Sequence, residues 1–152
     1  MPKMLGELNH NEIESLLHNQ MIGRIGCSDG DKVFVVPITY AYDGTFIYCH
    51  SKVGLKIEMM RNNPSVCFEV DQMTNMTDWK SVIAWGTYEE LLDEEELKIG
   101  TQIFSDRMKP FVASETLRPM MRQPEPHPPD IGPKPVFFRI RLTKKTSRYE
   151  LG

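Results

Sequence analysis

The first fifty residues change from a helical to a strand-like spacing of apolar positions. Ile13, Leu16 and Leu17 recur at helical intervals, so with an asparagine cap at position 9 or 11 they predict a helix that ends near residue 20. The following stretches are rich in β-branched and aromatic residues and predict strands at 21–27, 32–42 and 45–50. Turn-forming residues separate these strands at 28–31, and Asp43-Gly44 is typical of a hairpin.

The remainder of the chain predicts two more helices and four more strands. A helical spacing begins at Val53 and must end before Pro64, because the residue before a proline avoids the helical region. Residues 93–109 form the third expected helix, with four acidic residues at its positive N-terminal end. Eight of the eleven prolines lie in 110–135, which predicts an irregular segment. The expected strands are 65–70, 79–92 and a closing hairpin of 135–142 with 146–151.

Short strands joined by hairpins, with helices at the crossings, favour a mainly β fold with peripheral helices. Regular β-α-β alternation is absent from the sequence, as are the glycine-rich turn of a Rossmann site and a P-loop. We therefore expect residues 1–152 to form one domain, a closed or split antiparallel barrel.

Composition narrows the class of protein. The net charge of −3 lacks the basic surplus that a nucleic-acid binder uses against phosphate, so no nucleic-acid partner is expected. Three widely spaced cysteines without a C-x-x-C pair disfavour both a zinc site and a disulfide framework. No apolar run is long enough to cross a bilayer, and residues 1–7 lack the core of a signal peptide. A cytoplasmic protein without a membrane partner or a metal fits best.

Pro37 lies inside the strand pattern Val36-Pro37-Ile38-Thr39. Because a proline cannot donate to the ladder, this strand must lie at an edge or be interrupted where something approaches its backbone. A flat heteroaromatic ring with donors and acceptors along one side could take those ladder positions. Alternatively, the proline only protects an edge strand from aggregation.

The connection from the strand ending near Ser51 to the helix after Gly54 has the components of a phosphate site. The first turn of a helix offers free backbone N–H groups and a positive dipole end, and Ser51 and Lys56 add a hydroxyl and an ammonium there. The alternative is that Ser51 caps the helix and Lys56 is a solvated surface residue.

Aromatic and titratable residues add two further candidates. Trp79 and Trp85 lie six positions apart, so on a regular strand they share a face that could cover a ligand ring or a second subunit, or they are core residues. His50 titrates near neutral pH and could act as an acid or base, or simply hydrogen-bond a ligand or the backbone. No triad spacing accompanies it, so the sequence gives no support for hydrolysis.

Taken together, these stretches resemble the pyridoxamine 5′-phosphate oxidase-like family of FMN-binding split barrels, and within it the nitroimidazole-resistance branch. The ordered succession of motifs over about residues 20–92 carries the resemblance. The motifs are Gly23-Arg24-Ile25, Val36-Pro37-Ile38-Thr39-Tyr40, Tyr42-Asp43-Gly44, Ile47-Tyr48-Cys49-His50-Ser51, Gly54-Leu55-Lys56, Arg61-Asn62-Asn63-Pro64, Val66-Cys67-Phe68-Glu69-Val70 and Trp79-Lys80-Ser81-Val82-Ile83 with Gly86.

The resemblance implies a six-stranded split barrel that forms a homodimer with FMN at the interface. It places Val36 to Thr39 against the flavin ring through main-chain groups, and the Cys49-His50-Ser51 segment beside the flavin and its tail. Lys56 would bind the phosphate, and His50 would lie in the active site. The resemblance also implies that three residues of the second subunit reach the flavin: Trp79, Lys80 and Ser81. Two further candidates for contacts with the flavin are Arg24 and Arg148.

Two departures from the pyridoxamine oxidases proper argue against pyridoxamine phosphate as the substrate. Leu55 stands before Lys56 where a basic pair is usual, and the chain ends in Ser147-Arg148-Tyr149-Glu150 rather than in a substrate-binding segment. We expect an FMN-dependent oxidoreductase acting on a small molecule, with nitro-compound reduction conceivable and the electron donor unspecified. The alternatives are a non-catalytic flavin-binding or flavin-sensing protein, and a barrel that binds haem, deazaflavin or only a protein partner.

Overall fold

The computed structural model describes residues 4–111 and 134–152, which fold into one antiparallel sheet and three helices. The helices are α1 (His10–Asn19), α2 (Leu55–Asn62) and α3 (Glu94–Met108), and a short 3-10 turn, η1 (Lys109–Phe111), follows α3. The strands are β1 (Met4–Gly6), β2 (Ile22–Asp29), β3 (Lys32–Thr39), β4 (Ala41–Tyr42), β5 (Phe46–Ser51), β6 (Ser65–Asn75), β7 (Asp78–Glu90) and β8 (Val136–Leu151).

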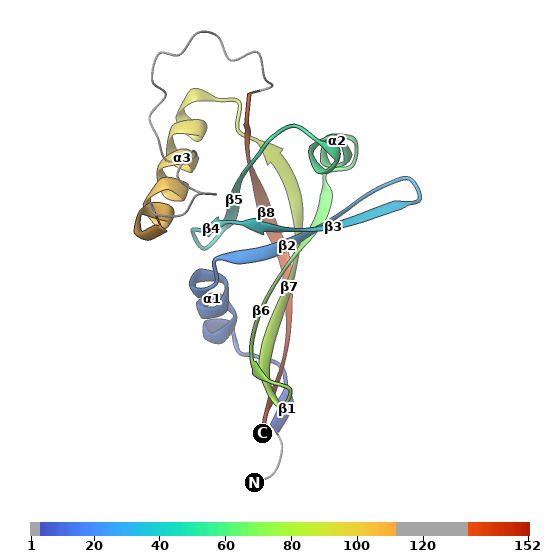
Figure 1. The fold of residues 1–152 in the computed structure, drawn as a ribbon, viewed down its shortest axis with the longest axis vertical. Helices are drawn as coiled ribbons and strands as arrows, with labels where there is room; N and C mark the ends of the chain where they lie inside the picture. The colour runs from blue at the N-terminus through green and yellow to red at the C-terminus, as the bar shows by residue number, and fades with distance from the viewer. Residues whose placement is uncertain (1–3, 112–133) are drawn as a thin grey trace.

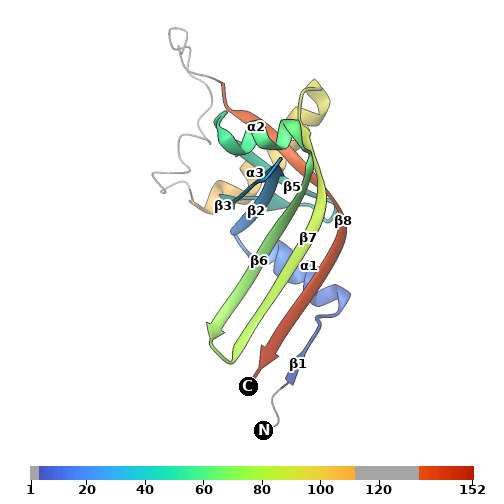
Figure 2. The ribbon, with the colours of Figure 1, turned by 90° about the vertical axis from the view of Figure 1, so that its right-hand side faces the viewer.

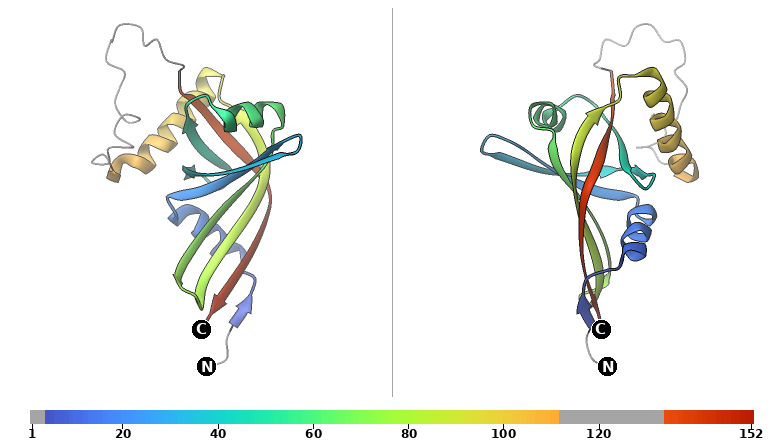
Figure 3. Two further views of the ribbon diagram at one scale, coloured as in Figure 1. Left: turned by 45° about the vertical axis from the view of Figure 1, so that its right-hand side comes forward. Right: turned by 180° about the vertical axis from the view of Figure 1, so that it is seen from behind.

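The strand order is β3-β2-β6-β7-β8-β5-β4, with β1 added on β8. β3 and β4 lie at opposite ends of this order, yet only Tyr40 separates them in the chain. The sheet must therefore curl until its two ends meet at Tyr40, which makes a barrel that is open along the rest of β3 (Figure 3). With β3 and β4 counted as one interrupted strand and β1 set apart, the described residues form the expected six-stranded split barrel.

Tyr40 fixes this closure from inside the barrel. Its side chain is almost completely buried, and its hydroxyl donates a hydrogen bond to the backbone carbonyl of Leu17 at 2.7 Å. Its ring meets Phe68 of β6 edge-on, with ring centroids 4.8 Å apart. A buried hydroxyl that kept no partner would cost about 1–3 kcal/mol, so the bond to α1 is part of the closure.

Alternate residues of the strands point inward and form the main core, and Ala41, Phe104 and Met108 form a smaller cluster between β4 and α3. The helices cover three parts of the barrel: α1 lies beside β6 and β7, α2 lies across β2, and α3 packs on β5 and β8 (Figures 1 and 2). The largest fully buried side chains are Leu17, Ile25, Tyr40, Ile47, Ile57, Met59, Met60, Phe68, Val70, Met108, Phe138 and Ile140.

The helix predictions are confirmed, including the asparagine cap of α1. Asn9 and Glu12 form a reciprocal capping box at the start of α1, and the Asp93 carboxylate accepts the N–H of Glu96 at the start of α3. The predicted strand 32–42 is interrupted at Tyr40, and β6 and β7 form a longer hairpin than expected. Most of the predicted irregular segment 110–135 lies outside the described residues.

The predicted closing hairpin at the C-terminus is wrong. Residues 136–151 form a single strand, β8, which pairs with β7 along nearly its whole length and reaches the end of the molecule where β1 lies (Figure 2). The residues between the two expected strands, Thr143 to Lys145, include no glycine, proline or asparagine to form a turn. Instead, Thr143 is an extra residue in the ladder, because Leu142 pairs with Gly86 and Lys144 with Trp85.

Gly86 is required by this bulge. A Cβ at position 86 would lie 2.3 Å from the carbonyl oxygen of Arg141, a backbone atom that cannot move aside without breaking the ladder. We predict that Gly86→Ser lowers the free energy of unfolding by about 2 kcal/mol or more in guanidinium titrations. Gly54→Ser is the matched control, since its Cβ meets nothing within 4 Å and serine is a favoured cap at this position. Equal stability of the two variants would contradict the tight β7–β8 approach.

Candidate functional site

The edge position predicted for the proline-bearing strand is confirmed. β3 pairs with β2, Pro37 lying opposite Arg24, and among the described residues no strand is paired along its other edge. Val36 and Thr39 are half-buried, Pro37 is exposed and Ile38 is buried in the core. The unpaired edge therefore presents backbone groups to any molecule that lies along 36–39. The side chains of Phe34 and Ile38 pack in the core and fix the strand from inside.

His50 lies near the end of β5 with an unsatisfied nitrogen. Its ring packs against Phe137 with centroids 4.6 Å apart, and its Nδ1 atom is buried without a hydrogen-bond partner among the described residues. Burial lowers the pKa of His50, which favours the neutral imidazole. A neutral imidazole with a free nitrogen is suited to donate or accept one hydrogen bond at this position.

Ser51 does not cap α2, so that alternative is wrong. Its hydroxyl donates to the carbonyl of Lys52 at 2.9 Å, and the helix, which begins after Gly54, has no hydrogen bond from a side-chain cap. The first N–H groups of α2 are consequently available to an anion. Lys56, in the same turn, is half-buried and forms no hydrogen bond or ion pair with any described residue.

The charge of Lys56 also reaches the barrel interior. Burial raises the pKa of the Cys27 and Cys49 thiols, and the Lys56 ammonium partly opposes this rise at both. Cys49 is fully buried, so any contact that it makes with a ligand outside the core must use its main chain. Lys56 is thus a cation at the start of α2 that lacks a carboxylate partner in the described part of the chain.

Of the two arginine candidates, Arg24 already forms ion pairs within the chain. Its guanidinium donates to the carboxylates of Glu69 and Asp71 at 3.5 and 3.3 Å. Burial and the neighbouring Asp71 raise the pKa of Glu69 to about 7, although Arg24 acts in the opposite direction. Arg148 is exposed on β8 opposite Ser81 and has no partner among the described residues.

Trp79, Lys80 and Ser81 lie at the start of β7, where it pairs with the end of β8, and far from α2 (Figures 1 and 2). Because successive strand residues point to opposite faces, Trp79 and Ser81 share the outer face, whereas Lys80 lies on the same side as the buried Val82. The Trp79 indole N–H donates to the Glu150 carboxylate at 3.1 Å. The structure does not bring these three residues to His50 and Lys56 within one chain.

The outer face of the sheet carries a groove that the sequence did not indicate. The side chains of Val33 and Val35 on β3 are 73% and 65% exposed, and Trp85 on β7 is 39% exposed. With Cys67 and Thr87 they line a depression of about 580 Å³, which we call the outer groove. Trp79 and Trp85 do share a face, as predicted, and Trp85 is not a core residue. The apolar residues at 33 and 35 were the available signal, because alternate positions of an edge strand face outward.

The described ranges 4–111 and 134–152 show neither a metal site nor a membrane-spanning helix. They include no group of three or more His, Cys, Asp or Glu side chains arranged to hold a metal ion. None of their helices combines the length and the apolar character needed to span a bilayer.

Comparison with known proteins assigns the chain to a family. Residues 9–146, most of the chain, match the family model described as pyridoxamine 5′-phosphate oxidase. The chain belongs to the pyridoxamine 5′-phosphate oxidase family. An uncharacterised protein of Rhizobium meliloti is 36% identical over 84 residues, which are 55% of this chain and 56% of that protein, so the alignment spans about half of either chain.

Two solved structures of similar fold are described as FAD-binding proteins. The one from Mesorhizobium loti is 28% identical, with a TM-score of 0.72 over 99% of this chain and 100% of that chain. The one from Mycobacterium smegmatis is 20% identical, with a TM-score of 0.67 over 97% of this chain and 100% of that chain, and shows the fold alone. These likenesses agree with the split barrel expected from the sequence.

The lowered pKa of His50 predicts a pH effect on the stability of this family member. The unfolded chain takes up a proton on His50 near the ordinary histidine pKa of about 6.5, and the folded protein, in which burial lowers this pKa, does so only at lower pH. The free energy of unfolding should therefore fall as the pH decreases from above 6.5 through the folded pKa. Denaturant titrations of the wild type and of His50→Gln across this range isolate the effect, because the other histidines are common to both. An unchanged difference between the two proteins at every pH would contradict the burial of this imidazole.

Proposed function

We propose that this member of the pyridoxamine 5′-phosphate oxidase family binds FMN and acts as a flavin-dependent oxidoreductase on a small molecule. The observation that carries the proposal is the combination of an open strand edge at 36–39 with an uncapped helix that bears an unpaired Lys56. A flat ring needs backbone donors and acceptors along its edge, and a phosphate needs N–H groups and a cation. The FAD-binding description of the Mesorhizobium loti structure agrees with a flavin as the ligand.

Each part of the proposed site has a defined task. Main-chain groups of Val36 to Thr39 would orient the ring, and the free N–H groups of α2 with Lys56 would hold the phosphate. Nδ1 of the neutral His50 would form a hydrogen bond with the ring or with a bound substrate and could hold a proton there. When bound, the flavin supplies the electron transfer, for which the protein contributes binding and orientation.

We further propose a homodimer with the flavin at the interface. A second copy on the outer face would bury the apolar outer groove, and its Trp79 and Ser81 could then approach a flavin held by His50 and Lys56 of the first copy. Within one chain, Trp79 and Ser81 lie at the opposite end of the fold from His50 and Lys56, so they cannot meet one flavin (Figures 1 and 2). This separation supports a site to which two chains contribute. Lys80 points to the inner face, so we exclude its side chain from the proposed shared site.

Resemblance to the nitroimidazole-resistance branch suggests a reductive role on small electrophiles such as nitro compounds. The protein loaded with FMN should oxidise NADH or NADPH faster when a nitroaromatic acceptor is added. Bound FMN without any such turnover would favour instead a flavin carrier or sensor with the same site.

Lys56→Ala should weaken FMN binding by roughly ten- to a hundredfold, because a charge-assisted phosphate contact is worth about 1.5–3 kcal/mol. Quenching of flavin fluorescence in a titration measures the dissociation constant. Lys52→Ala is the matched control: Lys52 is an exposed lysine on the same connection, before the start of α2. Equal FMN affinity of the two variants would remove Lys56 from the phosphate site.

Val35→Glu should raise the dissociation constant of the proposed dimer by at least about a hundredfold, because it buries an unpaired carboxylate in the outer groove. Light scattering on a size-exclusion column reports the mass of each species. Ile99→Glu places the same charge on an exposed apolar position of α3, away from the outer groove, and should leave the dimer intact. A wild-type protein that runs as a monomer would refute this part of the proposal.

A further inference from the structure

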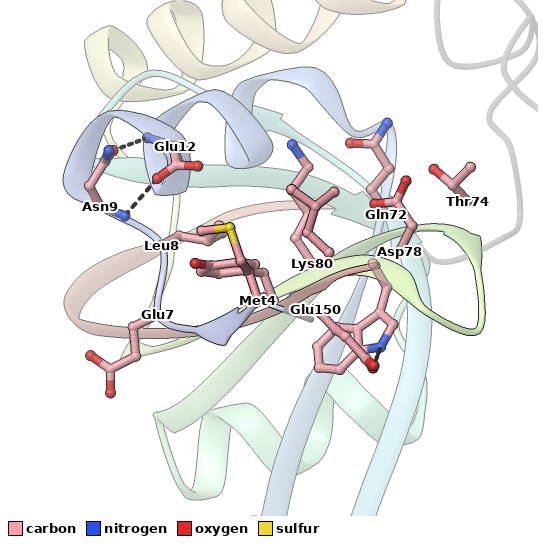
Figure 4. A pocket seen from close by; sticks show the side chains of 13 residues that line it. Met4, Glu7, Leu8, Asn9, Glu12, Gln72, Thr74, Asp78, Lys80 and Glu150 are labelled. Carbon is pink, nitrogen blue, oxygen red and sulfur yellow. Dashed lines mark hydrogen bonds between the residues drawn. The ribbon is translucent and has the colours of Figure 1, made fainter. Parts of the chain in front are cut away.

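Two of the three helices in the described residues have a side chain that fixes their first turn, and α2 has none. Asn9 and Glu12 close the first turn of α1 with reciprocal hydrogen bonds (Figure 4), and Asp93 caps α3. Gly54 precedes α2 in an extended conformation and contributes no side chain to the helix. The position of the first turn, which carries Lys56, must therefore be set by contacts elsewhere on α2.

The apolar face of α2 determines this position only loosely. Ile57, Met59 and Met60 are the buried residues of the helix and pack in the main core. Methionine side chains are unbranched and adapt to irregular gaps, so this face tolerates small shifts of the helix along or around its axis. Charge-assisted hydrogen bonds have defined directions and are better suited to fix one placement.

The last turn of α2 carries such a contact, between Arg61 and Glu90 at the end of β7. The guanidinium donates from Nε to one carboxylate oxygen and from Nη2 to the other, the second at 3.3 Å. The hydroxyl of the buried Tyr88 donates to the same carboxylate at 2.7 Å. The Arg61 guanidinium holds the pKa of Glu90 below its usual range, and burial raises the pKa of Tyr88. Glu90 is therefore an ionised acceptor that Tyr88 orients and Arg61 binds at two points. Arg61 is also the first residue of the motif Arg61-Asn62-Asn63-Pro64.

The other three residues of this motif bond to the sheet as well. The side-chain amides of Asn62 and Asn63 donate to Asp29 and Ser28 of β2 at 3.1 and 3.2 Å, respectively. The carbonyl of Pro64 accepts a backbone N–H of β7 at 2.8 Å. Because a short helix moves as a rigid rod, contacts at its end also place its first turn, which lies only about 8 Å away along the axis. The motif therefore has a structural task that its sequence alone did not reveal.

We propose that the Arg61–Glu90 pair positions the phosphate-binding turn of α2, with Tyr88 holding Glu90 in place. This inference rests on the proposed flavin site, since it concerns how the same turn is aligned. Loss of the pair would let α2 leave the placement that binds phosphate. The apparent affinity for FMN then falls with the share of molecules that keep that placement. Arg61 and Glu90 are positioning residues that act through α2.

Glu90→Gln separates positioning from a simple effect of charge. Removal of a carboxylate reduces the repulsion of a bound phosphate, so charge alone would strengthen FMN binding. Misplacement of the turn instead weakens FMN binding by about three- to fivefold, the worth of one partly exposed ion pair. Riboflavin, which has no phosphate, should bind as it does to the wild type. Fluorescence quenching titrations of the full-length protein measure both dissociation constants.

Glu89→Gln is the matched control. It removes the same charge from the adjacent residue, which pairs with Arg139 and Arg141 of β8 and not with α2. Its preference for FMN over riboflavin should not fall below that of the wild type. Arg61→Gln, at an exposed position that leaves the core intact, and the double variant with Glu90→Gln should each weaken FMN binding as Glu90→Gln does, because the two side chains act as one unit.

The wild type distinguishes failure of this inference from failure of the flavin site. Equal affinity of the wild type for FMN and riboflavin would overturn the proposed phosphate site, and the positioning role with it. A wild type that prefers FMN, with the same preference in Glu90→Gln and Arg61→Gln, would overturn the positioning role alone. Equal weakening of FMN and riboflavin in these variants would also overturn it, since general destabilisation gives that result.

Discussion

Closure of the sheet at Tyr40 determines where every candidate functional group lies. One residue joins the two ends of the strand order, so the sheet cannot open there without breaking the chain. Burial of the Tyr40 ring against Phe68 and the hydroxyl bond to Leu17 make this geometry the favourable one. The closure leaves the remainder of β3 as a free edge. The same barrel also contains β5, which leads to the start of α2. The proposed flavin site is a consequence of where the barrel closes and where it stays open.

Because successive residues of a strand point to opposite faces, the polar side chains of the long strands are divided between the two faces of the sheet. On β7, Trp79 and Ser81 lie on the outer face, whereas Lys80 lies on the inner face with the buried Val82. Residues that are neighbours in the sequence thus lie on opposite faces of the sheet. A sequence motif such as Trp79-Lys80-Ser81 cannot reveal this division until the inner face is identified by the buried Val82 and Ala84.

Local signals predicted the parts of the fold that depend on local chemistry. Asn9 and Asp93 marked the starts of α1 and α3, Pro64 marked the end of α2, and Pro37 marked an edge strand. The long β8 was mispredicted because its continuity is imposed by pairing with β7, and Thr143 is accommodated as a bulge rather than as a turn. Likewise β1 pairs with the far end of β8, and the outer groove does not exist until distant segments meet. Local patterns in the sequence pointed to the candidate flavin residues at 36–39 and 50–56, whereas Lys80, Ser81 and the two arginines came from the family resemblance.

The central claim is that the open edge of β3 and the start of α2 hold the ring and the phosphate of one flavin. The most direct measurement is a mass spectrum of the small molecules released by heat from the purified protein, together with its visible absorption spectrum. The account predicts a yellow protein that releases FMN in an amount close to one per chain. A colourless protein that releases no flavin and takes up none from solution would contradict it, while leaving the barrel itself intact.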